Sequence, residues 1–210
     1  MNTKRQGRSG RREAVVTAAM DLFSRKRYDD VYISEIAETA GVAHGLLFYH
    51  FKDKRGLYLE VLRRMLDELV DLQRRREDEL TGQQWLRGVT LRQVEYRREH
   101  AQTMLVMMRP GGHDEDVDAV VEQSRRAGVR FLADLVGLTG ELPPRVRITM
   151  RAAMGAADGM ITDWLTHGCD LEVTELIEAV YVVVVAALGT VCEHELDLKT
   201  VVGGPPARRT

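Results

Sequence analysis

Apolar residues recur at intervals of three and four along almost the whole chain, and no run alternates as a β-strand would. This spacing predicts an all-α protein of about nine helices. Besides two short helices near residue 40, the expected helices cover residues 9–25, 54–79, 83–97, 99–108, 114–138, 144–167 and 173–195. The charged stretch 74–79 at the end of the second long helix is interpreted as a solvated face.

Glycine and proline mark the ends of several of these helices. Pro110 and two following glycines interrupt the chain after residue 108. Pro143 and Pro144 stop one helix and start the next, because proline is tolerated only in a helix's first turn. The basic arm 1–8 and the tail 203–210 are expected to be flexible.

Residues 33–51 predict two short helices joined by a sharp turn. Ile36 belongs to the buried stripe of the first helix, and Gly41 provides a left-handed residue that ends it. Leu47 and Phe51, four positions apart, bury the inner face of the second helix. Two helices joined by such a turn, with the second exposed, form the helix-turn-helix that places a recognition helix in the major groove of DNA.

The outward face of the second short helix carries aromatic side chains and no acid. Lys52, Lys54 and Arg55 follow it directly, which gives a cationic rim suited to phosphates. An ordinary helical hairpin buried in a core would not require this cationic rim, so we predict binding to double-stranded DNA. The candidate DNA-binding residues are His44, Gly45, Leu46, Phe48, Tyr49, His50 and Lys54.

The charge distribution agrees with this placement. The net charge is −2, but residues 1–55 hold 11 Lys and Arg against 7 Asp and Glu, so the excess of acid lies in the remainder. Only the first quarter of the chain therefore suits a polyanion.

Residues 9–57 resemble the N-terminal domain of the TetR family of bacterial regulators. The matching positions are Arg12, Val15, Ala18, Ala19, Leu22 and Phe23, then Ile36, Ala37, Ala40, Gly41 and Val42, then Gly45, Leu47, Phe48, His50, Phe51 and Lys54. The resemblance implies a three-helix DNA-binding domain, a larger helical domain that dimerises and binds a small effector, and repression that the effector relieves.

The same resemblance assigns roles to single residues. It implies contacts with base edges for His44, Gly45 and Phe48, and contacts with phosphates for Tyr49, His50 and Lys54. These roles belong to the expected domain formed by residues 1–55, with residues 1–8 as a flexible arm.

Three positions depart from the family pattern. Ala43 stands where Ser is common, so a helix cap worth about 1 kcal/mol is missing. Phe48 replaces the usual Tyr and cannot donate a hydroxyl to DNA. Tyr32 stands where Thr or Ser usually caps the first short helix; the sequence alone favours Ser34 as that cap, and both registers remain open.

Residues 56–202 are expected to form the effector-binding and dimerisation domain, with residues 203–210 as its tail. The helix over 144–167 has a stripe of small residues suited to close helix contact, and the final helix is apolar almost all round. We expect both to lie at the interface of a homodimer. The predicted interface residues are Ala152, Gly155, Ala156, Gly159, Leu176, Val180, Val183 and Ala187.

Methionines and aromatic residues are concentrated in the middle of this second domain, where they either fill a core or line a pocket. Flexible thioethers suit an adaptable apolar cavity, and together with the resemblance they favour a small, mainly apolar effector. The predicted pocket residues are Trp85, Tyr96, Met104, Met107, Met108, Phe131, Met150, Met154 and Trp164.

Other classes of protein find little support. His167 with Cys169 and Cys192 with His194 resemble zinc ligands, but about 30 Å of helix separates the two pairs, so no metal or cofactor is expected. No Gly-x-Ser-x-Gly or phosphate-binding glycine loop suggests an enzyme. A helical adaptor that binds protein is the remaining alternative. The chain lacks an apolar run of about 20 residues, so we expect a cytoplasmic protein without a membrane partner.

Overall fold

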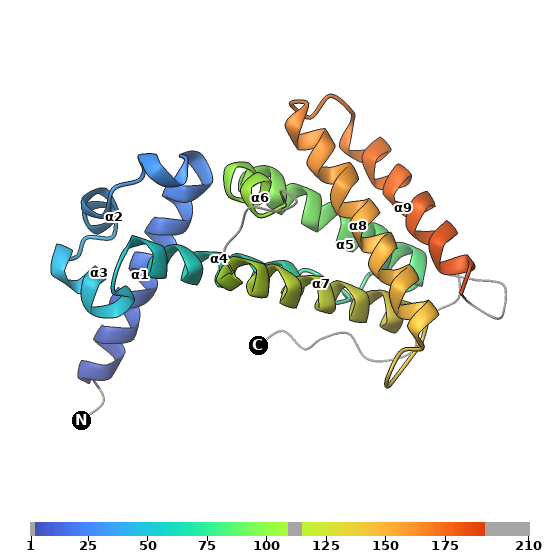
Figure 1. The fold of residues 1–210 in the computed structure, drawn as a ribbon, viewed down its shortest axis with the longest axis horizontal. Helices are drawn as coiled ribbons and strands as arrows, with labels where there is room; N and C mark the ends of the chain where they lie inside the picture. Colours follow the sequence, from blue (N-terminus) through green and yellow to red (C-terminus); the bar gives the residue numbers. More distant parts are fainter. Residues whose placement is uncertain (1–2, 109–114, 192–210) are drawn as a thin grey trace. The chain divides into compact units, whose positions relative to one another are not determined.

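A computed structural model of the chain describes residues 3–108 and 115–191, and it describes side chains over residues 10–105 and 115–191. The described part is helical with no strand, as predicted (Figure 1). Its elements are α1 (Thr3–Arg25), the 3-10 helix η1 (Tyr28–Asp30), α2 (Ile33–Thr39), α3 (His44–Phe51), α4 (Lys54–Asp71), α5 (Gly82–Glu99), α6 (Ala101–Met108), α7 (Glu115–Leu135), α8 (Pro144–Thr166) and α9 (Val173–Gly189).

Three of the predicted helix bounds are wrong. Helix α1 begins at Thr3, so residues 3–8 are helical and do not form the flexible arm that composition suggested. Helix α4 ends at Asp71 and not at residue 79. Helix α9 ends at Gly189 and not near residue 195. The predicted tail 203–210 lies outside the described residues.

Helix α4 ends early because side chains of α5 take over the carbonyl groups at its end. The Gln93 amide donates to the Leu69 carbonyl at 3.3 Å, and the Trp85 indole donates to the Gln73 carbonyl at 2.8 Å. Carbonyl groups at a helix end need such donors once the helical bonds stop. Tertiary contacts therefore decide where this helix stops.

The charged segment after α4 is anchored by a buried ion pair. The Glu79 carboxylate is bonded to the Arg92 guanidinium and also accepts the Arg76 backbone N–H at 2.8 Å. Gly88 makes room for this carboxylate, because a Cβ at that position would overlap it. The interpretation of residues 74–79 as a solvated face is thus wrong for Glu79.

The chain divides into two compact units that differ from the predicted domains. Among the described residues, one contains 3–66, 99–108 and 115–120, and the other contains 67–98 and 121–191. Helix α6 joins the first unit because it is bonded to α1: the Thr103 hydroxyl donates to the Phe23 carbonyl at 2.9 Å. The expected boundary at residue 55 therefore misses a second segment of the N-terminal unit.

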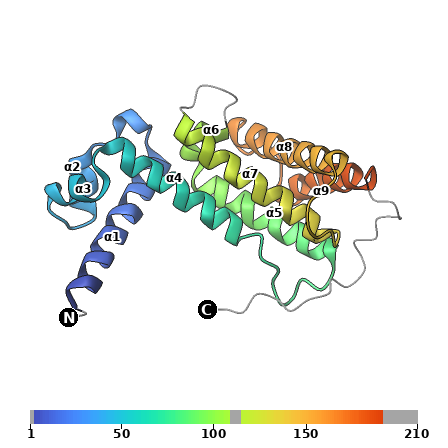
Figure 2. The ribbon, with the colours of Figure 1, turned by 60° about the horizontal axis from the view of Figure 1, so that its bottom comes forward.

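In the second unit, α8 and α9 run antiparallel and side by side, with α5 and α7 alongside (Figures 1 and 2). Met150 and Ile161 of α8 and Val184 and Leu188 of α9 are buried. The connection between the two helices is held by the Trp164 indole, which donates to the Leu171 carbonyl at 2.8 Å. Among the helices described, none is long and apolar enough to span a membrane.

Candidate nucleic-acid interface

The turn between α2 and α3 has the geometry that the sequence predicts. Gly41 has φ +63°, and its N–H donates to the Glu38 carbonyl at 3.0 Å, while the Val42 N–H donates to the Ala37 carbonyl at 3.0 Å. This pair of bonds is the Schellman motif, which uses a left-handed residue to close a helix. The predicted role of Gly41 is confirmed.

Neither short helix has a side-chain cap. Tyr32 occupies the N-cap position of α2, so the choice of Ser34 as its cap is wrong, and Tyr32 makes no capping hydrogen bond. Ala43 precedes α3 and likewise offers no capping bond, as its methyl side chain requires. The helix-turn-helix therefore depends on packing to hold its two helices.

That packing comes from the inner face of α3. Leu47 and Phe51 are buried, and the Arg12 guanidinium lies over the Phe51 ring at 5.2 Å from its centroid. Arg12 also forms an ion pair with Glu60 at 2.5 Å. One side chain of α1 thus contacts both α3 and α4.

The joint between α3 and α4 is tighter than the sequence indicated. Lys52 has φ +66°, and the Asp53 carboxylate accepts the Gly56 N–H at 2.7 Å across the first turn of α4. A Cβ on Gly56 would overlap the carbonyl oxygen of Phe51. The direction of α3 relative to α4 is therefore set by a contact that only glycine permits.

The outward face of α3 is exposed in the described part of the chain. His44, Gly45 and Phe48 are exposed, and Tyr49 is exposed to 65%. The His44 and Phe48 rings meet edge to face at 5.2 Å. A Cβ on Gly45 would meet nothing within 4 Å, so the fold itself does not require glycine there.

The remaining predicted contacts are less exposed. Leu46 and His50 are half-buried, and the Nε2 atom of His50 is buried without a hydrogen-bond partner in the described part. The Lys54 ammonium lies 4.4 Å from the centre of the Tyr28 ring and donates to the Asp29 carbonyl at 3.4 Å. Lys54 thus ties η1 to α4, a role that the sequence analysis did not anticipate.

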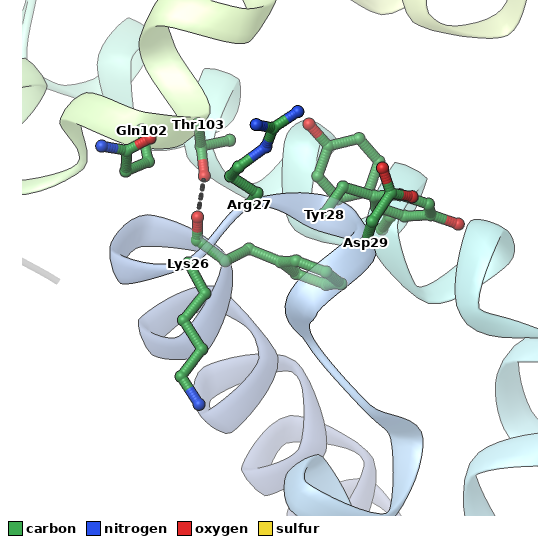
Figure 3. A pocket seen from close by; sticks show the side chains of 8 residues that line it. Lys26, Arg27, Tyr28, Asp29, Gln102 and Thr103 are labelled. Atoms are coloured by element: carbon green, nitrogen blue, oxygen red, sulfur yellow. Dashed lines mark hydrogen bonds between the residues drawn. The ribbon is translucent and has the colours of Figure 1, made fainter.

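A hollow of about 390 Å³ lies between the end of α1, η1, α4 and α6 (Figure 3). Its aromatic wall includes Tyr28 and Tyr58, whose ring centres are 4.9 Å apart. Burial raises the pKa of Tyr58 to about 12, so its phenol stays neutral. Lys26 points away from the α6 residues in Figure 3 and pairs with Glu35 at 2.5 Å.

The predicted pocket residues do not line one cavity. Phe131 and Met154 line a small cavity of about 30 Å³ in the second unit, and Trp85 meets the Phe131 ring at 5.3 Å. Met150 and Trp164 are buried in the packing of α8, and Tyr96 donates its hydroxyl to Glu68 at 2.8 Å. Met104 is buried in the first unit, and the side chains of Met107 and Met108 lie outside the described ones.

The predicted dimer interface separates into two groups. Ala152, Gly155 and Gly159 on α8 and Val183 on α9 are exposed, and Ala156 and Ala187 are half-buried. Leu176 and Val180, in contrast, are buried inside the same chain. Those two assignments are corrected, because a side chain enclosed by its own chain offers no surface to another copy.

Exposed apolar side chains adjoin the first group. Ile148 is 59% exposed on α8 and Val182 is 62% exposed on α9.

Within residues 3–108 and 115–191, no cluster of His, Cys, Asp and Glu could hold a metal ion; Cys192 and His194 lie outside that part.

Comparison with known proteins gives a family match and a shared fold. Residues 15–61 match the model of a family described as bacterial regulatory proteins, tetR family. The chain is 41% identical over 71 residues to the HTH-type transcriptional regulator RutR of Escherichia coli strain K12, which covers 33% of this chain and 34% of RutR. The match therefore spans about a third of the length of this relative.

Solved structures extend the similarity along the chain. A tetR-family transcriptional regulator from Streptomyces coelicolor superposes with a TM-score of 0.76 at 28% identity, covering 87% of this chain and 83% of that one. The regulator FadR from Bacillus subtilis, solved in complex with stearoyl-CoA, has a TM-score of 0.63 at 16% identity and covers 83% and 98%. FadR thus shares the fold.

The two glycines near α3 lead to opposite predictions for stability. Gly56→Ala forces a Cβ against a backbone carbonyl, and we expect it to lower the free energy of unfolding by about 1–3 kcal/mol. Gly45→Ala adds a methyl group to open space on a helix, so it should leave stability unchanged or raise it by up to about 1 kcal/mol. Urea unfolding followed by circular dichroism measures both. Equal effects of the two substitutions would contradict the description of the joint.

Proposed function

The chain belongs to the TetR family of bacterial regulatory proteins, and from this premise we propose that it regulates transcription by binding a DNA operator through α3. In this proposal it is a cytoplasmic repressor that releases its operator when a small, mainly apolar effector binds. The observation that carries the proposal is the uncovered, acid-free outward face of α3, held by the Gly41 turn and the Gly56 joint.

The geometry of α3 suits close approach to a base-pair edge. The absence of a side chain at Gly45 leaves the first turn of the helix open, and His44 stands beside it with two ring nitrogens that can donate or accept. Tyr49 offers a phenol to phosphate, and Lys52 adds an exposed positive charge. Lys54 contributes mainly by holding η1, so its effect on DNA is expected to be partly structural.

We propose that a homodimer forms through the exposed face of α8 and α9. The small residues Ala152, Gly155 and Gly159 allow close helix approach, and Ile148 and Val182 beside them expose apolar surface that another copy would cover. A twofold dimer presents two recognition helices, which is how helix-turn-helix proteins bind palindromic sites.

Release of DNA requires that effector binding alters the N-terminal unit. Helix α6 could carry such a change, because Thr103 bonds it to the end of α1 and His100, the residue before α6, forms a 2.7 Å hydrogen bond between its Nδ1 atom and Ser24 Oγ. An effector that favours one arrangement of these bonds shifts the population toward it. FadR, which shares the fold, is solved with an acyl-CoA, and this supports an effector with a large apolar part.

DNA binding is tested with duplexes that the purified protein selects from random-sequence DNA. We expect affinity to fall steeply with salt, and Gly45→Ala to weaken binding on the order of tenfold because its methyl group stands between α3 and the groove. Gly189→Ala, the same change at an open position of α9, is the matched control and should bind normally. Fluorescence anisotropy at several salt concentrations measures all three proteins.

Unchanged affinity of Gly45→Ala would place the DNA contact elsewhere. A wild-type protein with no salt-sensitive affinity for any duplex would favour the adaptor that binds protein.

Dimerisation is tested by adding a charge to the proposed interface. Val182→Glu would bury a carboxylate against the second copy, so we expect a shift from dimer to monomer at micromolar concentration in sedimentation velocity. Leu91→Glu is the control, because Leu91 is an exposed apolar residue of α5 outside the α8–α9 face. A dimer that survives Val182→Glu, or a wild-type monomer, would rule out this interface.

A further inference from the structure

Helix α5 carries two buried arginines, and the first of them is fully bonded. Each guanidinium nitrogen of Arg92 donates a hydrogen bond, and the acceptors are the Glu79 carboxylate and the carbonyl oxygens of Leu72 and Arg74. These bonds hold the segment after α4. The buried position of Arg92 is therefore explained by its structural role, and no ligand is needed to complete its hydrogen bonds.

The second arginine is only partly bonded. Arg97 is 6% exposed, and its terminal nitrogens donate to Gln93 Oε1 at 3.1 Å and to Asp158 Oδ1 at 3.0 Å. Its Nε atom is buried and has no hydrogen-bond partner among the residues described. Burial lowers the pKa of Arg97, which Asp158 partly offsets, but a guanidinium remains charged in proteins. A charged group with one unmet N–H is unfavourable in a core unless something completes it.

Arg97 lines the same small cavity as Phe131 and Met154, two of the predicted pocket residues. Thr90, Gln93, Arg97 and Asp158 form its polar part, and apolar side chains of α5, α7, α8 and α9 form the rest. Its volume of about 30 Å³ holds roughly one water molecule, so a larger guest must displace a wall.

Met154 is the residue lining this cavity whose side chain can change conformation most easily. Its unbranched thioether chain lines the cavity and packs against Gly128, where a Cβ would lie 2.7 Å from the Met154 methyl carbon. Methionine has three rotatable side-chain bonds and adapts to irregular contacts. Rotation of the Met154 side chain would enlarge the cavity next to Arg97.

The charges around Arg97 determine whether a ligand in this cavity should be neutral or anionic. The positive charge of Arg97 is already balanced by Asp158, whose side chain is 28% exposed. An anionic guest would bring a second negative charge into an apolar cavity, and this charge would have no partner of its own. A neutral carbonyl oxygen accepts the unmet N–H without adding charge.

We propose that this cavity is the effector site and that it takes an apolar molecule with one neutral carbonyl group, such as a ketone, ester or lactone, whose oxygen accepts from Arg97 Nε. The inference rests on the proposed effector-responsive function and identifies the chemical class of its ligand. Arg97 lies two residues before Glu99, where the chain enters the unit that contains α6. Ligand contact at Arg97 therefore acts on the segment that leads directly into α6.

Three probes of similar size separate the alternatives on the free protein, without DNA. They are 2-octanone, 2-methyl-1-octene, in which a methylene group replaces the carbonyl oxygen, and octanoate, which is charged. We expect 2-octanone to bind at least roughly tenfold more tightly than the other two, the range for one hydrogen bond to a charged group. Thermal shift and titration by NMR measure this, and the Nε–H signal of Arg97 should move while that of Arg92 stays.

A double variant tests the anchor without leaving a buried charge. Arg97→Met combined with Asp158→Leu replaces both partners by apolar side chains, which core ion pairs usually tolerate. This protein should fold and bind 2-octanone and 2-methyl-1-octene equally well. The thermal melting curve without ligand confirms its fold.

Three results would overturn the assignment: octanoate binding as tightly as the ketone, the alkene binding as tightly in the wild type, or no ketone binding at millimolar concentration. Ketone binding through Arg97 that leaves operator affinity unchanged would instead support the site and contradict the proposed regulation. The two failures are therefore distinguishable.

Discussion

The carbonyl oxygen of Phe51 approaches the backbone of Gly56 so closely that no side chain fits between them. This constraint fixes how α3 leaves the first turn of α4, and the buried face of α3 then follows from it. Arg12 secures the same corner by contacting the Phe51 ring and Glu60. Because its inner face is held in this way, the outer face of α3 can remain uncovered without loss of order.

The two buried arginines of α5 show how the same residue type serves stability in one place and recognition in another. Arg92 and Glu79 satisfy each other and the nearby carbonyl groups, so they close the link between α4 and α5. Arg97 keeps one N–H donor beside a cavity without a partner among the described residues. Binding sites often retain such unsatisfied groups, because a ligand that completes them is selected over one that cannot.

Local patterns let the sequence predict the helices, the turn at Gly41 and the exposed face of α3. These features depend on residues within one or two helical turns, where spacing and glycine chemistry decide the outcome. The end of α4 could not be predicted in this way, since Gln93 and Trp85 of another helix determine it. Leu176 and Val180 were assigned to the interface because an apolar helix does not reveal which of its faces its own chain covers.

The role of Arg97 was missed although a signal was present. It continues the buried stripe of Leu86, Thr90 and Gln93 along α5, where a charged residue is unexpected. The 30 Å³ cavity, in contrast, depends on four helices and has no sequence pattern of its own. The grouping of α6 with the N-terminal unit likewise depends on contacts such as that between Thr103 and Phe23, which lie 80 positions apart.

The central claim is that two copies of α3 bind DNA as a symmetric pair. Hydroxyl-radical footprinting on a duplex selected by the protein tests it most directly. The account predicts two protected half-sites related by a twofold axis, with centres about 34–36 Å or a multiple of that apart. A single asymmetric protected region bound by one chain would contradict it.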